Sequence, residues 1–300
     1  MNSLSITQAL EREKVLLSDG GWGTFLQKKG LKPGECPEMW NLEREEEVLD
    51  IARQYIKAGS DILETNTFGA NGFKLTHFGL TDRLDELNRV GVELSRRAAG
   101  DERWVMASVG PTGKMLITGD VTEEDLYRAF ADQVKPLAAG GADARMIETM
   151  SDAAEAALAV RAAKENTPCE VVCSFTFERT VHGDFRTMMG VAPGKAAEEA
   201  VAAGADIVGV NCGNGYDGLD MVVRELKEGS GGKPVLIQAN AGIPKRVGGV
   251  EVFPAEPGEM AEQVALWIES GAQIIGGCCG TMPEHIAALR RAVDDYKQDK

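Results

Sequence analysis

Residues 203–212 read Ala-Gly-Ala-Asp-Ile-Val-Gly-Val-Asn-Cys, a tight turn followed by a short apolar run. The Gly-Ala pair suits a chain that leaves a helix through a left-handed cap and turns back at once. The apolar run has no polar alternation, as in a strand of a parallel sheet that helices cover. Related turns start at residues 58, 140 and 270, with the sequences Ala-Gly-Ser-Asp, Gly-Gly-Ala-Asp and Ser-Gly-Ala-Gln. This recurrence predicts a repeated βα unit.

Outward from this stretch, strand-like apolar runs alternate with segments of helical period along the chain. We expect eight strands, at residues 15–19, 61–67, 104–109, 144–149, 170–177, 206–211, 234–240 and 273–277. We expect helices after them, at residues 43–58, 82–99, 122–139, 152–164, 195–203, 216–228, 258–270 and 283–296. The four turns precede every second strand, as paired units of a closed barrel would. The sequence therefore predicts the α/β class and a single (β/α)8 TIM barrel that takes up residues 1–300 as one domain, with a doubly wound open sheet as the alternative.

Composition and charge exclude several classes of protein. With 43% hydrophobic and 26% charged residues, the chain has the composition of a globular protein. Its net charge of −15 opposes binding to nucleic acid and to anionic lipid. We find no apolar run long enough to cross a bilayer, and the first 14 residues are polar and of mixed charge, unlike an export signal. We therefore expect a cytoplasmic protein with no nucleic-acid or membrane partner.

Three of the six cysteines fall at expected strand ends. Cys212 ends the sixth strand, and Cys278 and Cys279 follow the eighth strand among glycines that let the chain bend. The carboxyl ends of barrel strands meet at one mouth, where barrel enzymes place their chemistry. Three thiolates that leave a fourth position open form the ligand set of a catalytic zinc. We expect these three cysteines to bind one Zn²⁺ per chain.

Other motifs favour no second cofactor. We interpret Cys169 and Cys173 as buried thiols on the fifth strand and Cys36 as incidental. Residues 108–115 resemble a phosphate loop, but Ser108 stands where its first glycine should be and Met115 replaces its hydroxyl residue. Residues 21–26 lack the third glycine of a dinucleotide fingerprint. His285, on the last helix, is expected to be a surface or capping residue.

The strand ends carry a set of motifs: Asp-Gly-Gly-Trp-Gly-Thr at 19–24, Glu-Thr-Asn-Thr-Phe-Gly at 64–69, Glu-Thr at 148–149, Asn-Cys at 211–212, Asn-Ala-Gly at 240–242 and Gly-Gly-Cys-Cys-Gly-Thr at 276–281. In these motifs the sequence resembles the homocysteine S-methyltransferase family from Val15 to about Ala292. Within that family it is most similar to the homocysteine-binding domain of cobalamin-dependent methionine synthase. The resemblance implies an eight-stranded barrel, a zinc held by three cysteines and a methyltransferase of methionine biosynthesis.

The resemblance also implies residues that contact the substrate: Asp19, Gly20, Gly21, Glu148, Asn66 and Asn240. Asp19 and the two glycines match the region that holds the amino acid end of homocysteine, and Glu148 matches the acid that receives its ammonium group. Asn240 matches a residue near the metal that fills the open position without substrate. For Asp19 and Glu148 the alternative is a helix cap or a buried ion pair, and Asn66 can instead satisfy loop backbone.

The expected reaction follows from the ligands. Zinc removes the thiol proton of homocysteine or a related thiol, and the zinc thiolate attacks a methyl group. The donor is expected to come from outside the chain, because the sequence lacks an Asp-x-His-x-x-Gly stretch of the kind that ligates cobalt. Methylcobalamin on a separate corrinoid protein, giving methionine, is the first expectation, because the aromatic surroundings of the family's betaine-using branch are not evident here, where Thr149 follows Glu148. The alternative donors are a small sulfonium or ammonium compound, S-methylmethionine or betaine. The expected loop at residues 178–193 either contacts the donor or partner, or is a solvated loop.

Two rival functions stay open at this point. One is a metal-independent barrel lyase or isomerase acting on a phosphorylated substrate, which leaves the three cysteines unexplained. The other is a non-catalytic subunit that binds a corrinoid protein or senses an amino acid. The sequence also leaves open the direction of methyl transfer and the oligomeric state.

Overall fold

Eight parallel strands form the centre of the computed structural model, which describes residues 4–213, 215–247 and 250–298. They are β1 (Leu16–Leu17), β2 (Ile62–Leu63), β3 (Trp104–Val109), β4 (Ala144–Met150), β5 (Glu170–Phe175), β8 (Ile207–Cys212), β9 (Val235–Ala239) and β12 (Ala272–Gly277). They follow one another in the order β1-β12-β9-β8-β5-β4-β3-β2. The two outermost strands meet through Asp61, whose N–H donates to Leu17 O at 2.7 Å. The predicted (β/α)8 barrel is thus confirmed.

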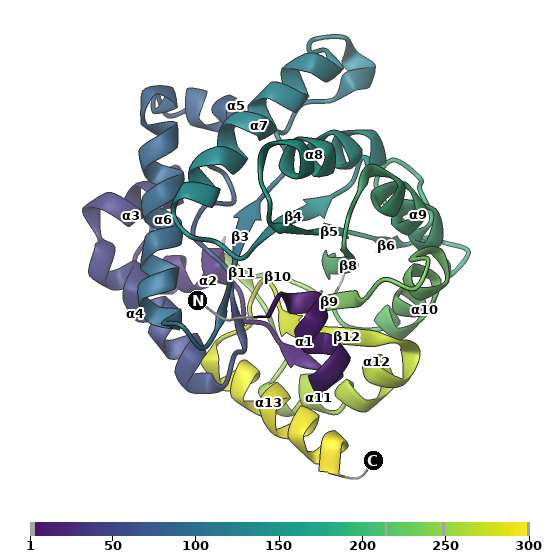
Figure 1. The fold of residues 1–300 in the computed structure, drawn as a ribbon. Helices are drawn as coiled ribbons and strands as arrows, with labels where there is room; N and C mark the ends of the chain where they lie inside the picture. The colour runs from purple at the N-terminus through teal and green to yellow at the C-terminus, as the bar shows by residue number, and fades with distance from the viewer. Residues whose placement is uncertain (1–3, 214, 248–249, 299–300) are drawn as a thin grey trace.

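Helices surround these strands (Figure 1). The larger ones are α4 (Glu45–Ala58), α6 (Leu84–Ala99), α7 (Glu123–Ala139), α8 (Ala153–Asn166), α9 (Pro193–Ala203), α10 (Leu219–Gly229) and α13 (Pro283–Gln298). The smaller ones are α2 (Trp22–Lys28), α3 (Trp40–Glu43), α5 (Gly72–Thr76), α11 (Pro257–Ala261) and α12 (Val264–Ser270), with 3-10 turns at Pro37–Met39, Thr81–Arg83 and Leu116–Thr118. The prediction of one helix at 258–270 is wrong, because α11 and α12 are separate. The helix predicted at 216–228 starts later, because Gly218 at its N-cap has a φ of 75°.

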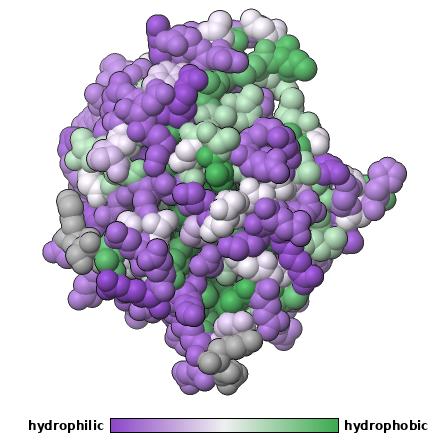
Figure 2. All heavy atoms as spheres, turned by 45° about the vertical axis from the view of Figure 1, so that its right-hand side comes forward, coloured by the Kyte–Doolittle hydropathy of each residue, from purple (hydrophilic) through white to green (hydrophobic). Residues whose placement is uncertain are grey.

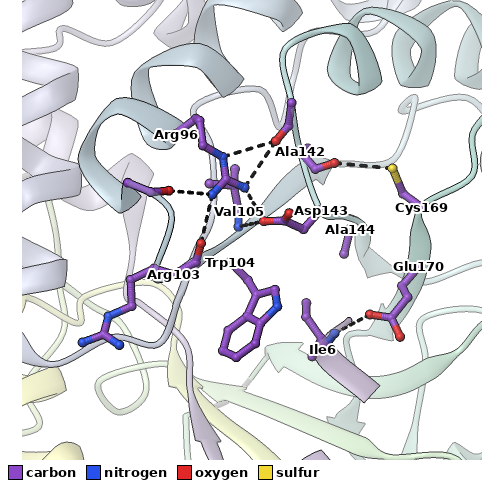
Figure 3. Close-up of polar contacts among 12 residues, drawn as sticks. Ile6, Arg96, Arg103, Trp104, Val105, Ala142, Asp143, Ala144, Cys169 and Glu170 are labelled. Atoms are coloured by element: carbon purple, nitrogen blue, oxygen red, sulfur yellow. Dashed lines mark hydrogen bonds and ion pairs between the residues drawn. The ribbon is translucent and has the colours of Figure 1, made fainter. Parts of the chain in front are cut away.

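The recurring turn has a structural role that its aspartates explain. Asp143 joins β3 to β4: its N–H donates to Val105 O at 2.8 Å, and its Oδ2 accepts the N–H of Val105 at 2.7 Å. Arg96 pairs with the same carboxylate (Figure 3). Asp206 makes the same contact between β5 and β8, because its Oδ2 accepts the N–H of Val171 at 2.8 Å. The turn motif therefore holds together neighbouring strands where they begin.

A short helix, α1 (Ile6–Glu13), closes the end of the barrel opposite the mouth. Its residues Ile6 and Leu10 pack with side chains from the starts of several barrel strands, among them Ile207. Glu170 on β5 accepts the N–H of Ile6 at 2.6 Å, which fixes the start of the helix (Figure 3). The sequence analysis assigned no helix here, although Ser5 and Gln8 form a capping box.

Two hairpins add to the loops at the mouth. Strands β6 (Glu178–Arg179) and β7 (Phe185–Arg186) lie in the predicted loop 178–193, and β10 (Lys245–Val247) pairs with β11 (Val250–Val252) after β9. Both hairpins were missed by the sequence analysis. On the face drawn in Figure 2, hydrophilic residues predominate and apolar residues form small groups between them. Among the described residues, no helix has the length and apolarity that a bilayer crossing requires.

Among the single-residue expectations, that for Cys169 needs correction. For His285 the capping alternative is confirmed, because its Nδ1 accepts the N–H of Met282 at 3.2 Å, and the residue is buried. Cys173 is fully buried as expected, whereas Cys169 is only partly buried, with its Sγ 3.4 Å from Ala142 O. Cys36 is buried, and its thiol donates to Glu38 Oε2 at 3.2 Å.

Candidate metal and substrate site

The thiols of Cys212, Cys278 and Cys279, called the cysteine cluster below, converge at the mouth of the barrel. Their three Sγ atoms all lie within 4.8 Å of one another, and Cys212 Sγ is 4.0 Å from Cys279 Sγ. No other group of three potential ligand side chains comes this close together in the described part of the chain. The structure thus brings together the cysteines that the sequence placed at two strand ends.

The local backbone explains how two adjacent cysteines share one side. β12 ends at Gly277, and the N–H of Cys278 donates back to Ala239 O at 2.8 Å before the chain turns. Gly280 completes the turn with a φ of 80°, a conformation that glycine adopts without strain. Cys212 itself has a φ of 63°, which is uncommon for a residue with a side chain and typical of functional sites.

The donors of the cysteine cluster fit a zinc ion. Tetrahedral zinc with Zn–S bonds of ~2.3 Å holds its sulfurs ~3.8 Å apart, close to the observed 4.0 Å between Cys212 and Cys279. Asn240 lies beside them, with its Nδ2 3.7 Å from Cys212 Sγ. Its Oδ1 is buried and finds no hydrogen-bond partner among the described residues. A hard oxygen without a partner next to three soft donors is expected where a cation binds.

Ionisation of the three thiols is coupled. Thiol hydrogen bonds from Cys278 and Cys279 lower the pKa of Cys212 to about 3. The same contact with Cys212 raises the pKa of Cys279 to about 12 and that of Cys278 well above its ordinary value. The protein alone therefore favours one thiolate shared among three sulfurs, and a divalent cation between them would favour ionisation of all three.

A cavity of about 250 Å³ opens over the cysteine cluster and is called the mouth cavity below. The carboxyl side chains of Glu38, Glu64 and Glu148 line it, and Trp22 and Phe68 are its aromatic side chains. Among its described lining residues there is no lysine or arginine. The cavity is therefore acidic on one side and sulfur-rich at its floor, a combination that suits a ligand with a cationic group and a thiol.

Glu148 projects from β4 with both carboxyl oxygens already engaged. Ser108 Oγ donates to Oε1, and Asn211 Nδ2 donates to Oε2 at 3.2 Å. Burial raises the pKa of Glu148 to about 7, although the hydrogen bond from Ser108 opposes this shift. The Lys74 ammonium also opposes the shift in the pKa of Glu148. No basic side chain lines the cavity itself, so a bound ammonium group would further stabilise the charged form of this carboxylate.

Asp19 and Glu64 lie beside each other at the ends of β1 and β2. Asp19 is fully buried, and its Oδ2 accepts from Trp22 Nε1 and from Glu64 N, each at 2.9 Å. Burial raises the pKa of Asp19 to about 7 against these hydrogen bonds. Gln238 Nε2 donates to Glu64 Oε1 at 2.7 Å, and burial raises the pKa of Glu64 well above its ordinary range. The sequence analysis gave no role to Glu64 or Gln238, although both lie in strand-end stretches that it examined.

The remaining predicted substrate residues line the mouth cavity in different ways. At Gly21 a Cβ would come within 2.5 Å of Cys278 O, and at Gly20 within 2.8 Å of Thr281 Oγ1, so both positions require glycine. Asn66 borders the cavity, but its Nδ2 donates to Pro37 O at 2.8 Å and holds the loop backbone. Its amide is therefore engaged in structure as well as placed near the cavity.

Comparison with known proteins agrees with this geometry. A model of the homocysteine S-methyltransferase family matches residues 16–293. The chain belongs to this family. The predicted enzyme class, a methyltransferase, is confirmed at the level of the family, and so is the resemblance from which it was inferred.

Curated relatives in the family are longer than this chain. Methionine synthase of Mycobacterium tuberculosis is 31% identical over 304 residues, which cover 95% of this chain and 25% of the relative. Methionine synthase of Mycobacterium leprae is 30% identical over 295 residues, covering 94% and 24%. The chain thus spans about a quarter of the length of these relatives.

Solved structures agree on the fold. The metallated form of the homocysteine methyltransferase MmuM from Escherichia coli has a TM-score of 0.79, with 23% identity over 94% of this chain and 98% of that chain. Its oxidised form has a TM-score of 0.75. At this level of identity the similarity supports the barrel architecture that the homocysteine S-methyltransferase family shares.

Proposed function

We propose that this chain acts as one homocysteine S-methyltransferase-like barrel domain, which methylates the sulfur of homocysteine to give methionine. The observation that carries the proposal is the cysteine cluster at the floor of the mouth cavity, with Asp19 and Glu148 buried close by. A thiol amino acid has the two matching groups, a sulfur for the cluster and an ammonium for the carboxylates. Membership in the homocysteine S-methyltransferase family supports the same substrate.

Cys212, Cys278 and Cys279 would hold a zinc ion in this proposal. When bound there, zinc lowers the pKa of the substrate thiol, so that the thiolate is available as the nucleophile. The buried Oδ1 of Asn240 is suited to occupy the open ligand position until the substrate sulfur replaces it.

The protein's own residues orient the substrate. Glu148 receives the ammonium in a charge-assisted hydrogen bond, and Ser108 and Asn211 keep its carboxylate pointing into the mouth cavity. Asp19 is fully buried behind two lining residues, because its Oδ2 accepts from Trp22 Nε1 and from the N–H of Glu64, and it holds both in place. Because these groups are fixed before the substrate arrives, little conformational entropy is lost when the sulfur is aligned for attack.

The methyl donor in this proposal is methylcobalamin on a separate corrinoid protein that docks on the mouth. Eight of the eleven large hydrophobic side chains that are exposed in the described residues lie in loops that follow β2, β3, β5 or β9. They are Phe68, Met115, Ile117, Val181, Met188, Met189, Ile243 and Val252. All four loops lie on the mouth side of the barrel, and Phe68 lines the cavity. Exposed apolar side chains on this side of the barrel support an interaction surface there. The hairpin β6–β7 carries Val181, which is 97% exposed and has no packing role within the chain.

The test is the zinc content of the purified protein and the zinc-edge X-ray absorption spectrum with and without homocysteine. We expect one zinc per chain, with three sulfur ligands that rise to four when homocysteine is added. Zinc with an unchanged sulfur count would refute homocysteine as the acceptor, and protein purified under reducing conditions without metal would refute the zinc site. Cys173→Ser is the matched control, because this thiol is buried away from the mouth and should leave the spectrum unchanged.

A further inference from the structure

Two loops that carry different parts of the proposed site meet where the barrel closes. Residues 18–21, between β1 and α2, are called the glycine loop below and contain the two glycines of the proposed substrate site. Residues 278–281, after β12, are called the cysteine loop and contain two cysteines of the cysteine cluster. Because β1 and β12 pair in parallel, both loops leave the sheet on the mouth side as neighbours. Their relative position therefore affects how the amino acid end of a substrate lies relative to its sulfur.

The hydroxyl of Thr281 forms hydrogen bonds to both loops. Its Oγ1 donates to Cys278 O at 2.7 Å and accepts the N–H of Gly21 at 3.0 Å. A hydroxyl has one donor and two acceptor sites, so both bonds form at the same time. The N–H of Gly21 also approaches Thr281 O, at the longer distance of 3.3 Å. One oxygen atom thus connects the glycine loop to the backbone of a cluster cysteine.

The surroundings of Thr281 leave this hydroxyl little freedom. Thr281 is fully buried, and a Cβ at Gly20 would lie 2.8 Å from its Oγ1. A Cβ at Gly277 would come even closer, at 2.3 Å. The backbone is fixed as well, because the hydroxyl of the buried Tyr55 donates to Thr281 O at 3.2 Å. The position of the hydroxyl is therefore set before any ligand binds.

Thr281 also closes a local turn, which is the simpler interpretation of its hydroxyl. Its N–H donates to Cys278 O at 3.1 Å, beside the bond from Oγ1 to the same oxygen. Closing that turn requires no bond to Gly21, which lies 260 positions away in the sequence. Thr24 adds a second connection, because its Oγ1 donates to Gly21 O at 3.1 Å and accepts the N–H of Gly280 at 3.2 Å. The backbone of Gly21 is thus bound to the cysteine loop through both its N–H and its carbonyl.

We propose that Thr281 is a positioning residue that fixes the amino acid end of the substrate relative to the zinc site. It acts through Gly21 and Cys278, which line the mouth cavity, and does not line the cavity itself. The inference rests on the proposed function and deepens it, because it names a contact that relates the two ends of a thiol amino acid. A preorganised site favours a ligand that uses both ends. Loss of the Thr281 hydroxyl should therefore weaken such a ligand more than a simple thiol.

The test compares two thiols in the zinc-loaded protein. Homocysteine has the thiol and the amino acid end, whereas 1-propanethiol has only the thiol and the carbon chain. Calorimetry measures the affinity of each for the wild type, Thr281→Val and Thr281→Ser. Valine keeps the shape of threonine without the hydroxyl, and serine keeps the hydroxyl. We expect Thr281→Val to lower the affinity for homocysteine relative to 1-propanethiol by ~10-fold, the effect of one lost hydrogen bond, and Thr281→Ser to keep the wild-type ratio.

Zinc affinity is measured in the same variants by competition with a chelator. We expect Thr281→Val to bind zinc ~10-fold more weakly, as when a group that orients metal ligands is removed, and Thr281→Ser to bind it as the wild type does. Thr167→Val is the matched control, because Thr167 is also buried and its hydroxyl donates to Ala163 O at 2.8 Å, at the end of α8. This control should leave the thiol ratio and the zinc affinity unchanged.

The outcomes separate this inference from the proposed function. A wild type that binds homocysteine no more tightly than 1-propanethiol would refute the proposed function, and this inference with it. A wild-type preference that persists in Thr281→Val, or an equal loss for both thiols, would overturn the role of Thr281 alone. So would a Thr281→Ser variant that behaves like Thr281→Val. If Thr281→Val does not fold, Thr281→Ala removes the same hydroxyl, and the same ratio is compared with that of Thr281→Ser.

Discussion

Replacing Glu148 by glutamine should weaken homocysteine binding through the substrate ammonium alone. Glutamine keeps the size of the side chain, and its amide oxygen can accept from Asn211 Nδ2 as Oε2 does at 3.2 Å. Its amide nitrogen then faces Ser108, whose hydroxyl can rotate and accept in place of donating. We therefore expect the fold and the metal content of Glu148→Gln to stay as in the wild type.

The magnitude follows from the kind of bond that is lost. Glu148 is only 7% exposed, so its bond to an ammonium group is screened little by solvent. A hydrogen bond to a charged group contributes about 1.5–3 kcal/mol, which corresponds to a loss of affinity of roughly 10- to 150-fold.

The assay is calorimetric titration of Glu148→Gln and wild type with homocysteine and with 4-mercaptobutanoate. The second ligand has the same thiol and carboxylate but no ammonium. We expect the substitution to reduce the affinity for homocysteine and to leave that for 4-mercaptobutanoate unchanged. An equal loss for both ligands would mean that Glu148 acts on the metal or on the shape of the cavity, and the assignment of the ammonium contact would be wrong.

Three further predictions concern metal, stability and thiol reactivity. Cys279→Ser should lose zinc and methyl transfer with an unchanged circular dichroism spectrum, because a serine hydroxyl stays protonated; retained zinc and turnover would contradict the ligand assignment. Asp143→Asn should lower the free energy of unfolding in urea by about 1–3 kcal/mol, because the hydrogen bonds from Val105 N and Arg96 lose their charged acceptor. An unchanged midpoint of the urea unfolding curve would refute the structural role of this turn. Burial raises the pKa of Cys173, so its thiol should stay protonated as the pH rises through 9. We therefore expect this thiol to react with iodoacetamide only in unfolded protein. Rapid labelling of Cys173 in folded protein, mapped by mass spectrometry, would contradict that expectation.

The barrel could be predicted because its signals are local. A turn such as Gly204-Ala205-Asp206 is complete within a few residues, and the apolar run that follows it marks the next strand. The hairpin β6–β7 gave no such signal, because each of its strands is two residues long and β6, made of the exposed Glu178 and Arg179, has no buried face to produce a pattern. The helix α1 did have a signal, the capping box between Ser5 and Gln8. The overall polarity of this stretch hides that signal, because only Ile6, Ala9 and Leu10 of the helix are buried.

The meeting of the three cysteines could be predicted because the carboxyl ends of parallel barrel strands lie on the same side of the barrel. That rule brought Cys212 to Cys278 and Cys279 across two strands, and the structure places their sulfurs together. The rule does not say which polar side chains at a strand end pair with one another. The contact between Glu64 and Gln238 joins residues 174 positions apart, and nothing in either stretch of sequence predicts it.

Asn211 explains why the two ends of a substrate would be held at a fixed separation. It precedes Cys212 on β8, and its Nδ2 donates to Thr149 Oγ1 at 2.7 Å while its Oδ1 accepts the N–H of Thr149 at 2.9 Å. Thr149 follows Glu148 on β4 and has a φ of 59°, so both strand ends bend where Asn211 joins them. Because bent backbone at these positions costs of order 1–3 kcal/mol, the paired hydrogen bonds of Asn211 offset strain that would otherwise straighten the strands. If Cys212 holds the substrate sulfur and Glu148 its ammonium, as proposed, the amide bridge of Asn211 helps to fix the distance between the two. We then expect a thiol amino acid with a shorter or longer chain than homocysteine to reach only one of them.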